Sequence, residues 1–264
     1  MALTITTLRS SSKGNCSFVT DGKTKILIDC GVSFKQIKEA LANLEQDIAE
    51  IDAVVITHEH SDHTKGLGVL SRNTDIPVFA NKETWQRMYM AHEGIKDKSI
   101  KIHRGVFSIG DIEITPFSIS HDAVNPVGYA FEKGKEKVAY LTDSGTVNYE
   151  MALAVKGARE IVLESNHDIN MLKNGIYPQQ LKARILGDYG HLSNDFAGQF
   201  AQKLLEWGTE KFILGHLSPE NNLPSIARNS FISYMDRLSA KEEKDFTVTV
   251  APMDKPSHIK DTNK

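Results

Sequence analysis

Residues 57–63 of the chain read Thr-His-Glu-His-Ser-Asp-His, which places three histidines and an aspartate within six consecutive positions. They directly follow Ala-Val-Val-Ile at residues 53–56, an apolar β-branched run that is typical of a buried strand. Neutral imidazole nitrogens and carboxylate oxygens are common metal ligands, and packing alone does not explain four of them at a strand end. We therefore predict a metal site here; the alternative is a polar loop that happens to be rich in histidine.

The spacing within this cluster suits two metal ions. His58 and His60 are two positions apart, so their side chains point the same way in an extended segment. Asp62 and His63 are adjacent, so their side chains diverge, as they would at the start of a helix. The spacing predicts that His58 and His60 bind one metal, and that Asp62 and His63 bind the other.

The composition is typical of a soluble globular protein, with 264 residues, 40% hydrophobic and 25% charged. This length suits one large domain or two small ones. The net charge of −3 gives no overall sign of nucleic-acid binding, so any basic surface must be local. No apolar run is long enough to span a bilayer, and the N-terminus lacks a signal-peptide pattern. With only two cysteines, Cys16 and Cys30, we expect a cytoplasmic protein without disulfides.

Hydrophobic periodicity and turn residues predict a chain that begins with strands and continues with mixed helices and strands. Strands are expected at residues 3–8, 16–20, 24–29, 53–57, 78–80, 100–103, 111–119, 127–132, 137–142, 160–163, 211–214 and 246–250. Helices are expected at residues 33–44, 65–71, 82–93, 149–156, 179–186, 194–207 and 226–238. The first of these helices opens with a capping-box pattern at Ser33 and Gln36. One domain over residues 1–251 is expected, followed by a disordered tail at 252–264.

The spacing H-x-H-x-D-H at residues 58–63 resembles the signature of the metallo-β-lactamase superfamily. The order of the predicted elements is similar to that of its four-layer αβ/βα sandwich. This resemblance covers almost the whole chain and implies an α/β fold with two facing mixed β-sheets and helices outside. It also implies a metal site along one edge, on loops that follow strands.

Three further residues follow predicted strands and complete the ligand set that this resemblance implies. They are His121, Asp143 and His216. By analogy, the first metal takes His121 beside His58 and His60, the second takes His216 beside Asp62 and His63, and Asp143 bridges them. Asp29 also follows a strand, and the resemblance implies that it orients a ligand instead of binding metal.

Two close cations activate a water and stabilise negative charge, which suits the hydrolysis of lactams, thioesters, lactones or phosphodiesters. His191 lies in a polar loop before a helix, and phosphodiesterases of the superfamily carry a similar histidine that contacts the phosphate or protonates the leaving oxygen. A helix-capping loop is the alternative. Other tentative substrate contacts are Ser12, Asn15, Glu164, His167 and Ser193.

Several motifs beyond the superfamily signature resemble the YycJ/WalJ family of bacterial proteins. They are Ser-Ser-Ser-Lys-Gly-Asn-Cys at 10–16, Leu-Thr-Asp-Ser-Gly at 141–145, Glu-Ser-Asn-His-Asp at 164–168, Gly-His-Leu-Ser-Asn at 190–194 and Gly-His-Leu-Ser-Pro-Glu-Asn-Asn at 215–222. The family is described as 5′-to-3′ exodeoxyribonucleases linked to DNA repair. The resemblance implies DNA ends as substrate, attack by a metal-bound hydroxide, and Asp62, Asp143 and His191 as catalytic residues.

Two alternatives to a nuclease stay open. The first is a hydrolase of a small substrate, such as a cyclic phosphodiester, a thioester or a lactone, and the second is a non-catalytic metal-binding protein. The basic residues that would meet phosphates are scattered along the sequence: Arg9, Lys13, Lys173, Lys182, Arg184 and Arg228. The mixed ligands suit zinc, manganese or iron, and the sequence leaves the metal, DNA versus RNA, and the oligomeric state open.

Overall fold

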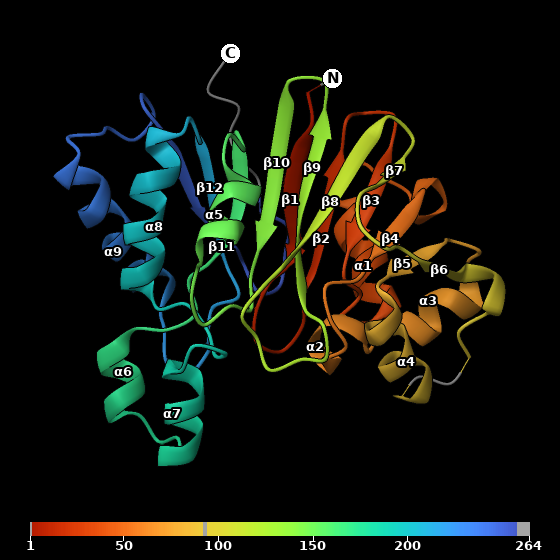
Figure 1. Cartoon of the computed structure of the whole chain (residues 1–264), viewed down its shortest axis with the longest axis horizontal. Helices are drawn as coiled ribbons and strands as arrows, with labels where there is room; N and C mark the ends of the chain where they lie inside the picture. The colour runs from red at the N-terminus through yellow and green to blue at the C-terminus, as the bar shows by residue number, and fades with distance from the viewer. Residues whose placement is uncertain (1, 92–93, 258–264) are drawn as a thin grey trace.

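The structure is a computed structural model that describes residues 2–91 and 94–257, and its strands form two mixed β-sheets (Figure 1). The first sheet has the order β1-β2-β3-β4-β5-β6, in which β1 to β3 are antiparallel neighbours and β3 to β6 run parallel. Its strands are β1 (Thr4–Arg9), β2 (Cys16–Thr20), β3 (Lys25–Ile28), β4 (Ala53–Val55), β5 (Val78–Ala80) and β6 (Ile100–Ile102).

The second sheet has the order β13-β12-β11-β10-β9-β8-β7. Neighbours from β7 to β10 are antiparallel, and those from β10 to β13 are parallel. Its strands are β7 (Phe107–Ile109), β8 (Ile112–Ser118), β9 (Val127–Lys133), β10 (Glu136–Leu141), β11 (Glu160–Glu164), β12 (Lys211–Gly215) and β13 (Thr247–Val250).

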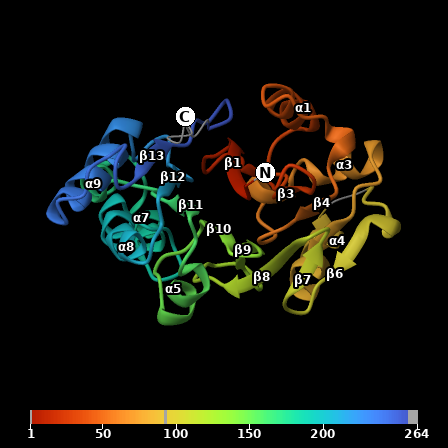
Figure 2. The same ribbon diagram turned by 90° about the horizontal axis from the view of Figure 1, so that it is seen from above.

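Helices cover the outer face of each sheet, so that the two sheets lie between two helical layers (Figure 2). The first sheet is covered by α1 (Phe34–Ala42), α3 (Leu67–Asn73) and α4 (Lys82–Ala91), and the second by α5 (Tyr149–Val155), α8 (Asn194–Glu206) and α9 (Pro224–Arg237). The remaining helices are α2 (Ser61–Thr64), α6 (Ile169–Asn174), α7 (Gln179–Leu186) and the 3-10 turns Ile48–Glu50 and Asp97–Ser99. This arrangement confirms the predicted αβ/βα sandwich.

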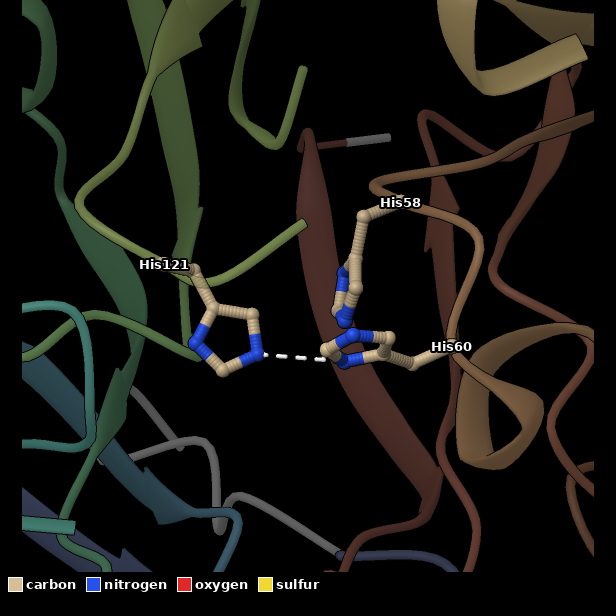
Figure 3. A group of neighbouring side chains, drawn as sticks. All are labelled: His58, His60 and His121. Carbon is tan, nitrogen blue, oxygen red and sulfur yellow. Dashed lines mark hydrogen bonds between the residues drawn. The ribbon is translucent and has the colours of Figure 1, made fainter. Parts of the chain in front are cut away.

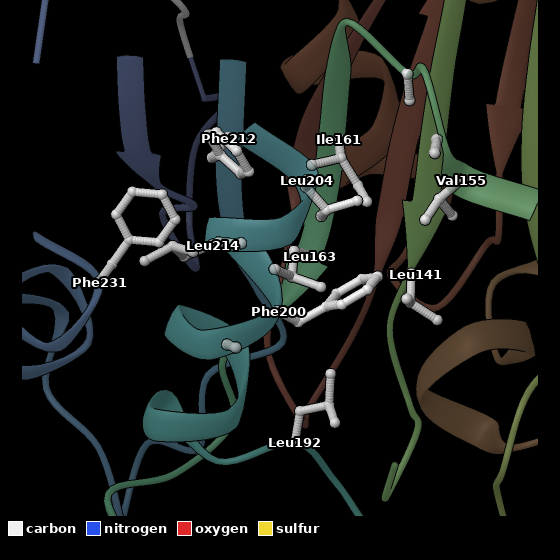
Figure 4. Close-up of a cluster of buried hydrophobic side chains, with 14 of the residues drawn as sticks. Leu141, Val155, Ile161, Leu163, Leu192, Phe200, Leu204, Phe212, Leu214 and Phe231 are labelled. Carbon is white, nitrogen blue, oxygen red and sulfur yellow. The ribbon is translucent and has the colours of Figure 1, made fainter. Parts of the chain in front are cut away.

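Three apolar clusters hold the layers together. In β4, Ala53 and Val55 face the space between the sheets, whereas Val54 and Ile56 face the helices α1, α3 and α4. Because successive side chains of a strand point to opposite faces, burial on both faces explains why residues 53–56 are apolar at every position. The cluster outside the second sheet is built the same way, with Phe200 and Leu204 of α8 packed on that sheet (Figure 4).

The topology brings the carboxyl ends of several strands to one edge of the sandwich. In the first sheet β1, β3 and β4 run in the same direction, because β2 is antiparallel to both β1 and β3. In the second sheet β8, β10, β11 and β12 share a direction for the same reason. Residues that directly follow these strands are therefore placed near one another.

All the predicted helices and strands are present, with their ends shifted by a few residues at most. The capping box at Ser33 forms, since its hydroxyl accepts from the Gln36 backbone and its backbone N–H donates to the Gln36 side chain. The sequence analysis expected a helix start near Asp62 and His63 but gave no range for α2, and it did not predict α6 or β7, because one or two helical turns or three strand residues carry too little periodicity. The predicted helix at 82–93 ends at Ala91, and residues 92–93 lie outside the described part of the chain.

The expected tail begins with residues that contact the first sheet. Ser257 is buried, its backbone N–H donates to Thr7 O at 2.8 Å, and its hydroxyl lies 2.8 Å from that of Thr7. Residues 258–264, the rest of the tail expected to be disordered, lie outside the described residues. Among the described residues, no helix combines the length and the apolar character needed to cross a membrane.

The turn between β2 and β3 generates a stability prediction. Burial by itself raises the pKa of Asp21, but hydrogen bonds from Lys133 Nζ and from the backbone N–H groups of Thr24 and Lys23 outweigh it and lower the pKa to about 2. The ionised form therefore stabilises the fold above the ordinary pKa of 3.8, and this contribution is lost as the pH falls through 3.8 toward 2.

We expect Asp21→Asn to lower the free energy of unfolding by roughly 1–2 kcal/mol at pH 7, because the charged hydrogen bond is lost. Urea unfolding at pH 7, 5 and 3 measures the difference from the wild-type chain. That difference should shrink toward pH 3, because Asp21 of the unfolded wild-type chain, with its ordinary pKa of 3.8, takes up a proton there. A difference that stays constant over this range would contradict the role of the carboxylate.

Candidate metal centre

The predicted ligands meet at the edge where the strands end. His58 and His60 follow β4, His121 follows β8, Asp143 follows β10 and His216 follows β12. Asp62 and His63 lie in α2, which begins at Ser61 directly after the histidine pair. The structure therefore brings together all seven residues that the sequence analysis selected as ligands, although His58 and His216 lie 158 positions apart in the chain.

The first group of donors consists of His58, His60 and His121, whose nitrogens all lie within 4.8 Å of one another. Figure 3 shows His58 and His60 coming from the segment after β4 and His121 approaching from the loop after β8. His121 Nε2 and His60 Nδ1 are 3.2 Å apart. Four donors at 2.0–2.1 Å from a tetrahedral metal lie roughly 3.3 Å from one another, so this spacing suits one ion.

The second group consists of Asp62, His63, Asp143 and His216. His63 Nε2 lies 3.4 Å from Asp62 Oδ2 and 3.3 Å from Asp143 Oδ2. His216 Nε2 lies 3.4 Å from Asp62 Oδ2 and 3.3 Å from Asp143 Oδ1. Asp143 Oδ1 is also 3.9 Å from His121 Nε2, so this carboxylate reaches toward both groups.

Most of the histidines are held through Nδ1, which leaves Nε2 directed to the centre. His63 Nδ1 lies 2.7 Å from Asp29 Oδ2, and His216 Nδ1 lies 2.8 Å from Glu164 Oε1. His121 Nδ1 lies 3.2 Å from the carbonyl oxygen of Gly190. A ring whose Nδ1–H donates to an oxygen keeps a lone pair on Nε2, which is the arrangement that a metal requires.

Asp29 connects β3 with the segment that carries the histidines. Its buried carboxylate accepts hydrogen bonds from the backbone N–H and the hydroxyl of Thr57 as well as from His63. Asp29 thus contacts a candidate ligand and the segment that carries it, and its role in orienting that ligand stays a prediction.

Glu164 connects the second group with His191. It is fully buried, and its Oε1 lies 2.8 Å from Nδ1 of both His216 and His191, while Oε2 accepts from the backbone N–H groups of Ser144 and Leu192. Glu164, His191, Asp143 and His216 are also close enough to form a third group of donors. Because both oxygens of Glu164 are already used, we interpret it as a residue that positions the two histidines.

Three residues of the centre have a left-handed backbone. Asp29, Asp143 and His216 have φ values of 62°, 58° and 56°, and each directly follows a strand or lies one residue beyond it. This conformation is uncommon for residues other than glycine, although aspartate and histidine adopt it more readily than most. The left-handed turn lets each side chain reach other residues of the centre: Asp29 contacts His63, Asp143 lies beside His63, and His216 lies beside Asp62. The surrounding hydrogen bonds maintain this conformation.

Buried carboxylates dominate the electrostatics of the second group. Burial opposes protonation of His63 and His216, but Asp143, together with Asp29 and Asp62 at His63 and with Asp62 and Glu164 at His216, outweighs it. The pKa of His63 is therefore raised well above its ordinary value, and the pKa of His216 is raised to about 10. In the first group, burial and the neighbouring histidines lower the pKa of His58. The second group thus concentrates negative charge that a cation would neutralise.

Two buried polar atoms support metal binding at these groups. Neither His58 Nε2 nor Asp143 Oδ2 has a hydrogen-bond partner among the described residues, although both are shielded from solvent. A buried donor or acceptor without a partner is costly, and coordination of a metal would satisfy both atoms. The two clusters of histidine and aspartate are therefore able to bind metal ions.

The tentative substrate contacts are brought to the same edge, but most of them contact the protein itself. Asn15 is buried, with Nδ2 3.1 Å from His63 Nε2, and His167 is buried beside Asn166. Ser193 caps α8 by accepting from the Phe196 backbone N–H, as the capping alternative anticipated. Ser12 is exposed on the loop after β1 and accepts from Asn166 at 3.4 Å.

Sequence reasoning missed two features of the centre. It did not foresee that Glu164 contacts two histidines, because those contacts join segments that lie far apart in the chain. It also missed Gly31, where an added Cβ would lie 1.6 Å from Asp62 O. The sequence offered a signal only for Glu164, which ends an apolar strand as a carboxylate.

Two facing mixed sheets and a histidine- and aspartate-lined centre at their strand ends define the metallo-β-lactamase class of fold. The family model described as the Beta-lactamase superfamily domain matches residues 24–217. The chain is 40% identical over 250 residues to Exodeoxyribonuclease YycJ of Bacillus anthracis, covering 94% of this chain and 92% of that protein. It therefore belongs to the YycJ/WalJ family within this superfamily, as the sequence motifs predicted.

Other comparisons agree with this assignment. Exodeoxyribonuclease WalJ of Streptococcus pneumoniae is 39% identical over 245 residues, which cover 91% of each chain. Among solved structures, the metallo-β-lactamase fold protein YhfI of Bacillus subtilis aligns with a TM-score of 0.69 at 16% identity, covering 97% of this chain and 100% of that one. Yeast PDE1 aligns with a TM-score of 0.70 at 14% identity, covering 97% of this chain and 99% of that one. At these identities the structures show the fold alone.

Gly31→Ala is predicted to disturb the centre from a position outside the ligand set. The new methyl group would overlap the Asp62 carbonyl, so the backbone of α2 must move and carry Asp62 and His63 with it. We expect weaker zinc binding at the second group, measured by titration calorimetry with the metal-free protein. Gly134→Asn is the control, because an added Cβ meets nothing within 4 Å there and asparagine tolerates its φ of 61°. Equal zinc affinity in Gly31→Ala and wild type would contradict the predicted displacement of Asp62 and His63.

Asp29→Asn is predicted to weaken zinc binding through His63. The amide N–H would donate to Nδ1 and move the ring proton to Nε2, where the metal requires a lone pair. We expect roughly a 10–100-fold loss of zinc affinity at the second group. Asp21→Asn makes the same chemical change in a buried aspartate at the opposite edge and should leave the affinity unchanged. If both variants bind zinc like the wild type, Asp29 does not control the tautomer of the His63 ring.

Proposed function

We propose that this protein is a metal-dependent phosphodiesterase that removes nucleotides from the 5′ end of DNA. The observation that carries the proposal is the 40% identity to Exodeoxyribonuclease YycJ over 94% of the chain. The geometry supports the chemistry, because the chain presents two adjacent groups of donors with a shared carboxylate. Two metals close together suit the hydrolysis of a phosphodiester, in which negative charge increases in the transition state.

We assign the ligands as follows. His58, His60 and His121 would hold one divalent ion, Asp62, His63 and His216 would hold the other, and Asp143 would bridge them. When bound, these ions would activate a water molecule and neutralise charge on the phosphate. Zinc or manganese suits the mixture of imidazole and carboxylate, and iron is compatible with it.

His191 is proposed to protonate the leaving oxygen. Its ring lies against both groups, with centroids 5.1 Å from His121 and 5.2 Å from His216, and the side chain keeps 12% of its surface exposed. Glu164 accepts from Nδ1 and thereby fixes the ring, so that Nε2 would give its proton to the leaving oxygen when both ring nitrogens carry one. Asp62 and Asp143 complete the proposed catalytic set as ligands whose carboxylates also orient the attacking water.

The biological setting is proposed on the same family relationship. We expect the domain of residues 1–251 to act on single- or double-stranded DNA ends, in DNA repair and in the cytoplasm. A hydrolase of a small phosphodiester, thioester or lactone is the rival function, and it shares the same metal chemistry.

The first test compares the wild-type chain with Asp143→Ala. Each protein is loaded with manganese or zinc and incubated with end-labelled single- and double-stranded DNA, with a small phosphodiester in parallel. We expect the wild type to shorten DNA stepwise from the 5′ end. The variant should be at least about 100-fold slower and should bind less metal, because Asp143 reaches both groups. Asp111→Ala changes an exposed aspartate at the opposite edge and should behave like the wild type.

The outcomes separate the rival functions. Turnover of the small ester without shortening of DNA would refute the nuclease assignment and favour a small-molecule hydrolase. Full activity of Asp143→Ala on DNA would instead refute the proposed bridging role.

A further inference from the structure

The basic residues noted in the sequence are partly engaged by the protein itself. Arg9 and Lys182 are buried, whereas Lys13 and Lys173 are exposed. Lys13 lies 3.5 Å from Glu220, Arg184 is paired with Asp122, and Arg228 is paired with Glu242 on the helical face of the second sheet. Proteins usually bind nucleic acid through Lys and Arg contacts with phosphates. Since only some of these cations are accessible, a strand at this site would gain from a further source of affinity.

A segment formed by α6, α7 and the turn after α7 extends beside the centre (Figure 1). Two polar contacts join it to loops that carry site residues. Arg184 Nη2 lies 2.8 Å from Asp122 Oδ1, next to His121, and the Tyr177 hydroxyl donates to Glu220 at 3.1 Å in the loop after His216. The segment is thus fixed to the loops that follow β8 and β12, beside the centre.

Tyr189 lies at the tip of the turn that ends this segment and is 67% exposed. It is two residues before His191, and the carbonyl of its neighbour Gly190 lies 3.2 Å from His121 Nδ1. Consecutive Cα atoms are about 3.8 Å apart, so the Cα atom of Tyr189 lies within two such steps of the Cα atom of His191, the proposed proton donor. Tyr189 is therefore an exposed aromatic side chain at the rim of the centre.

The turn that presents Tyr189 is tightly packed. The Gly190 backbone N–H donates to Gly187 O at 2.9 Å, and that of His191 donates to Ile185 O at 3.1 Å. A Cβ at Gly190 would lie 2.2 Å from Ile185 O, and one at Gly145, in the loop after Asp143, would lie 2.3 Å from Gly187 O. Because the backbone is confined on two sides, the position from which the Tyr189 side chain projects is fixed before a ligand binds.

We propose that Tyr189 is a substrate-binding residue on which a nucleobase next to the scissile phosphate stacks. The inference rests on the proposed nuclease function and adds recognition of the base to it. Stacking on an aromatic ring tolerates every base, because each base has a π-face, and this suits an enzyme that degrades DNA of any sequence. It also adds affinity to that of the exposed cations Lys13 and Lys173.

The experiment combines enzyme variants with modified DNA. The variants are Tyr189→Ala, Tyr189→Phe and the control Tyr149→Ala, which removes a 77% exposed tyrosine on α5. The metal-loaded proteins are titrated with a fluorescent single-stranded oligonucleotide that has phosphorothioate linkages. A second series carries one abasic residue at each of the first three positions from the 5′ end. Rates of shortening of ordinary DNA are measured in parallel.

We expect Tyr189→Ala to weaken binding roughly tenfold, while Tyr189→Phe and Tyr149→Ala stay within about twofold of wild type. At one position, an abasic residue should weaken binding to the wild type by a similar factor and have little further effect on Tyr189→Ala. A structural role of Tyr189 would not produce this dependence on one base.

Unchanged binding of Tyr189→Ala, or an abasic penalty that is equal in wild type and variant at every position, would overturn the assignment. Failure of the wild type to shorten ordinary DNA would instead refute the proposed nuclease function. The binding measurements do not depend on cleavage, so they decide the role of Tyr189 in either case.

Discussion

Burial of carboxylates at the strand ends is the constraint on which the centre depends. Asp29, Asp143 and Glu164 are almost completely shielded from water, and Asp62 is mostly shielded. Charges in such positions require partners, and the structure provides His63 and His216, each of which lies near oxygens of three carboxylates. The same requirement explains why the histidines are held through Nδ1 and why the pKa values of His63 and His216 are raised. A divalent cation in this place would replace protons as the counter-charge.

The two sheets contribute their donor residues to the centre in different ways. The first sheet supplies His58, His60 and α2 from one continuous segment, which Asp29 and Thr57 hold in place. The second sheet supplies single residues from separate strands, and Glu164 joins two of them. Since the first and second groups of donors each combine residues from both sheets, the centre exists only when the sandwich is closed. The apolar contacts between the sheets, such as those of Val55 and Tyr129, therefore support the site directly.

Access to the centre is shaped by loops that the core does not fix. The α6–α7 segment is attached by polar contacts, carries exposed apolar side chains such as Ile176, and ends at the turn that presents Tyr189. Exposed apolar residues beside a polar centre often mark a binding surface. The metal chemistry is shared by the whole superfamily, whereas the proposed binding of a nucleic-acid strand depends on this surface.

The local sequence determined the dense ligand cluster at 57–63, the strand before it, the capping box at Ser33 and the amphipathic helix at 194–207. These features depend on residues close together in the chain, where periodicity and spacing are visible. The resemblance to a known family then supplied His121, Asp143 and His216, which are ordinary strand-end residues in local terms. Only the tertiary structure decided that Glu164 holds both His191 and His216, that Asn15 and His167 are buried, and that Tyr189 is exposed beside the centre. These properties arise from contacts between segments that the sheet topology brings together, and no local pattern in the sequence encodes them.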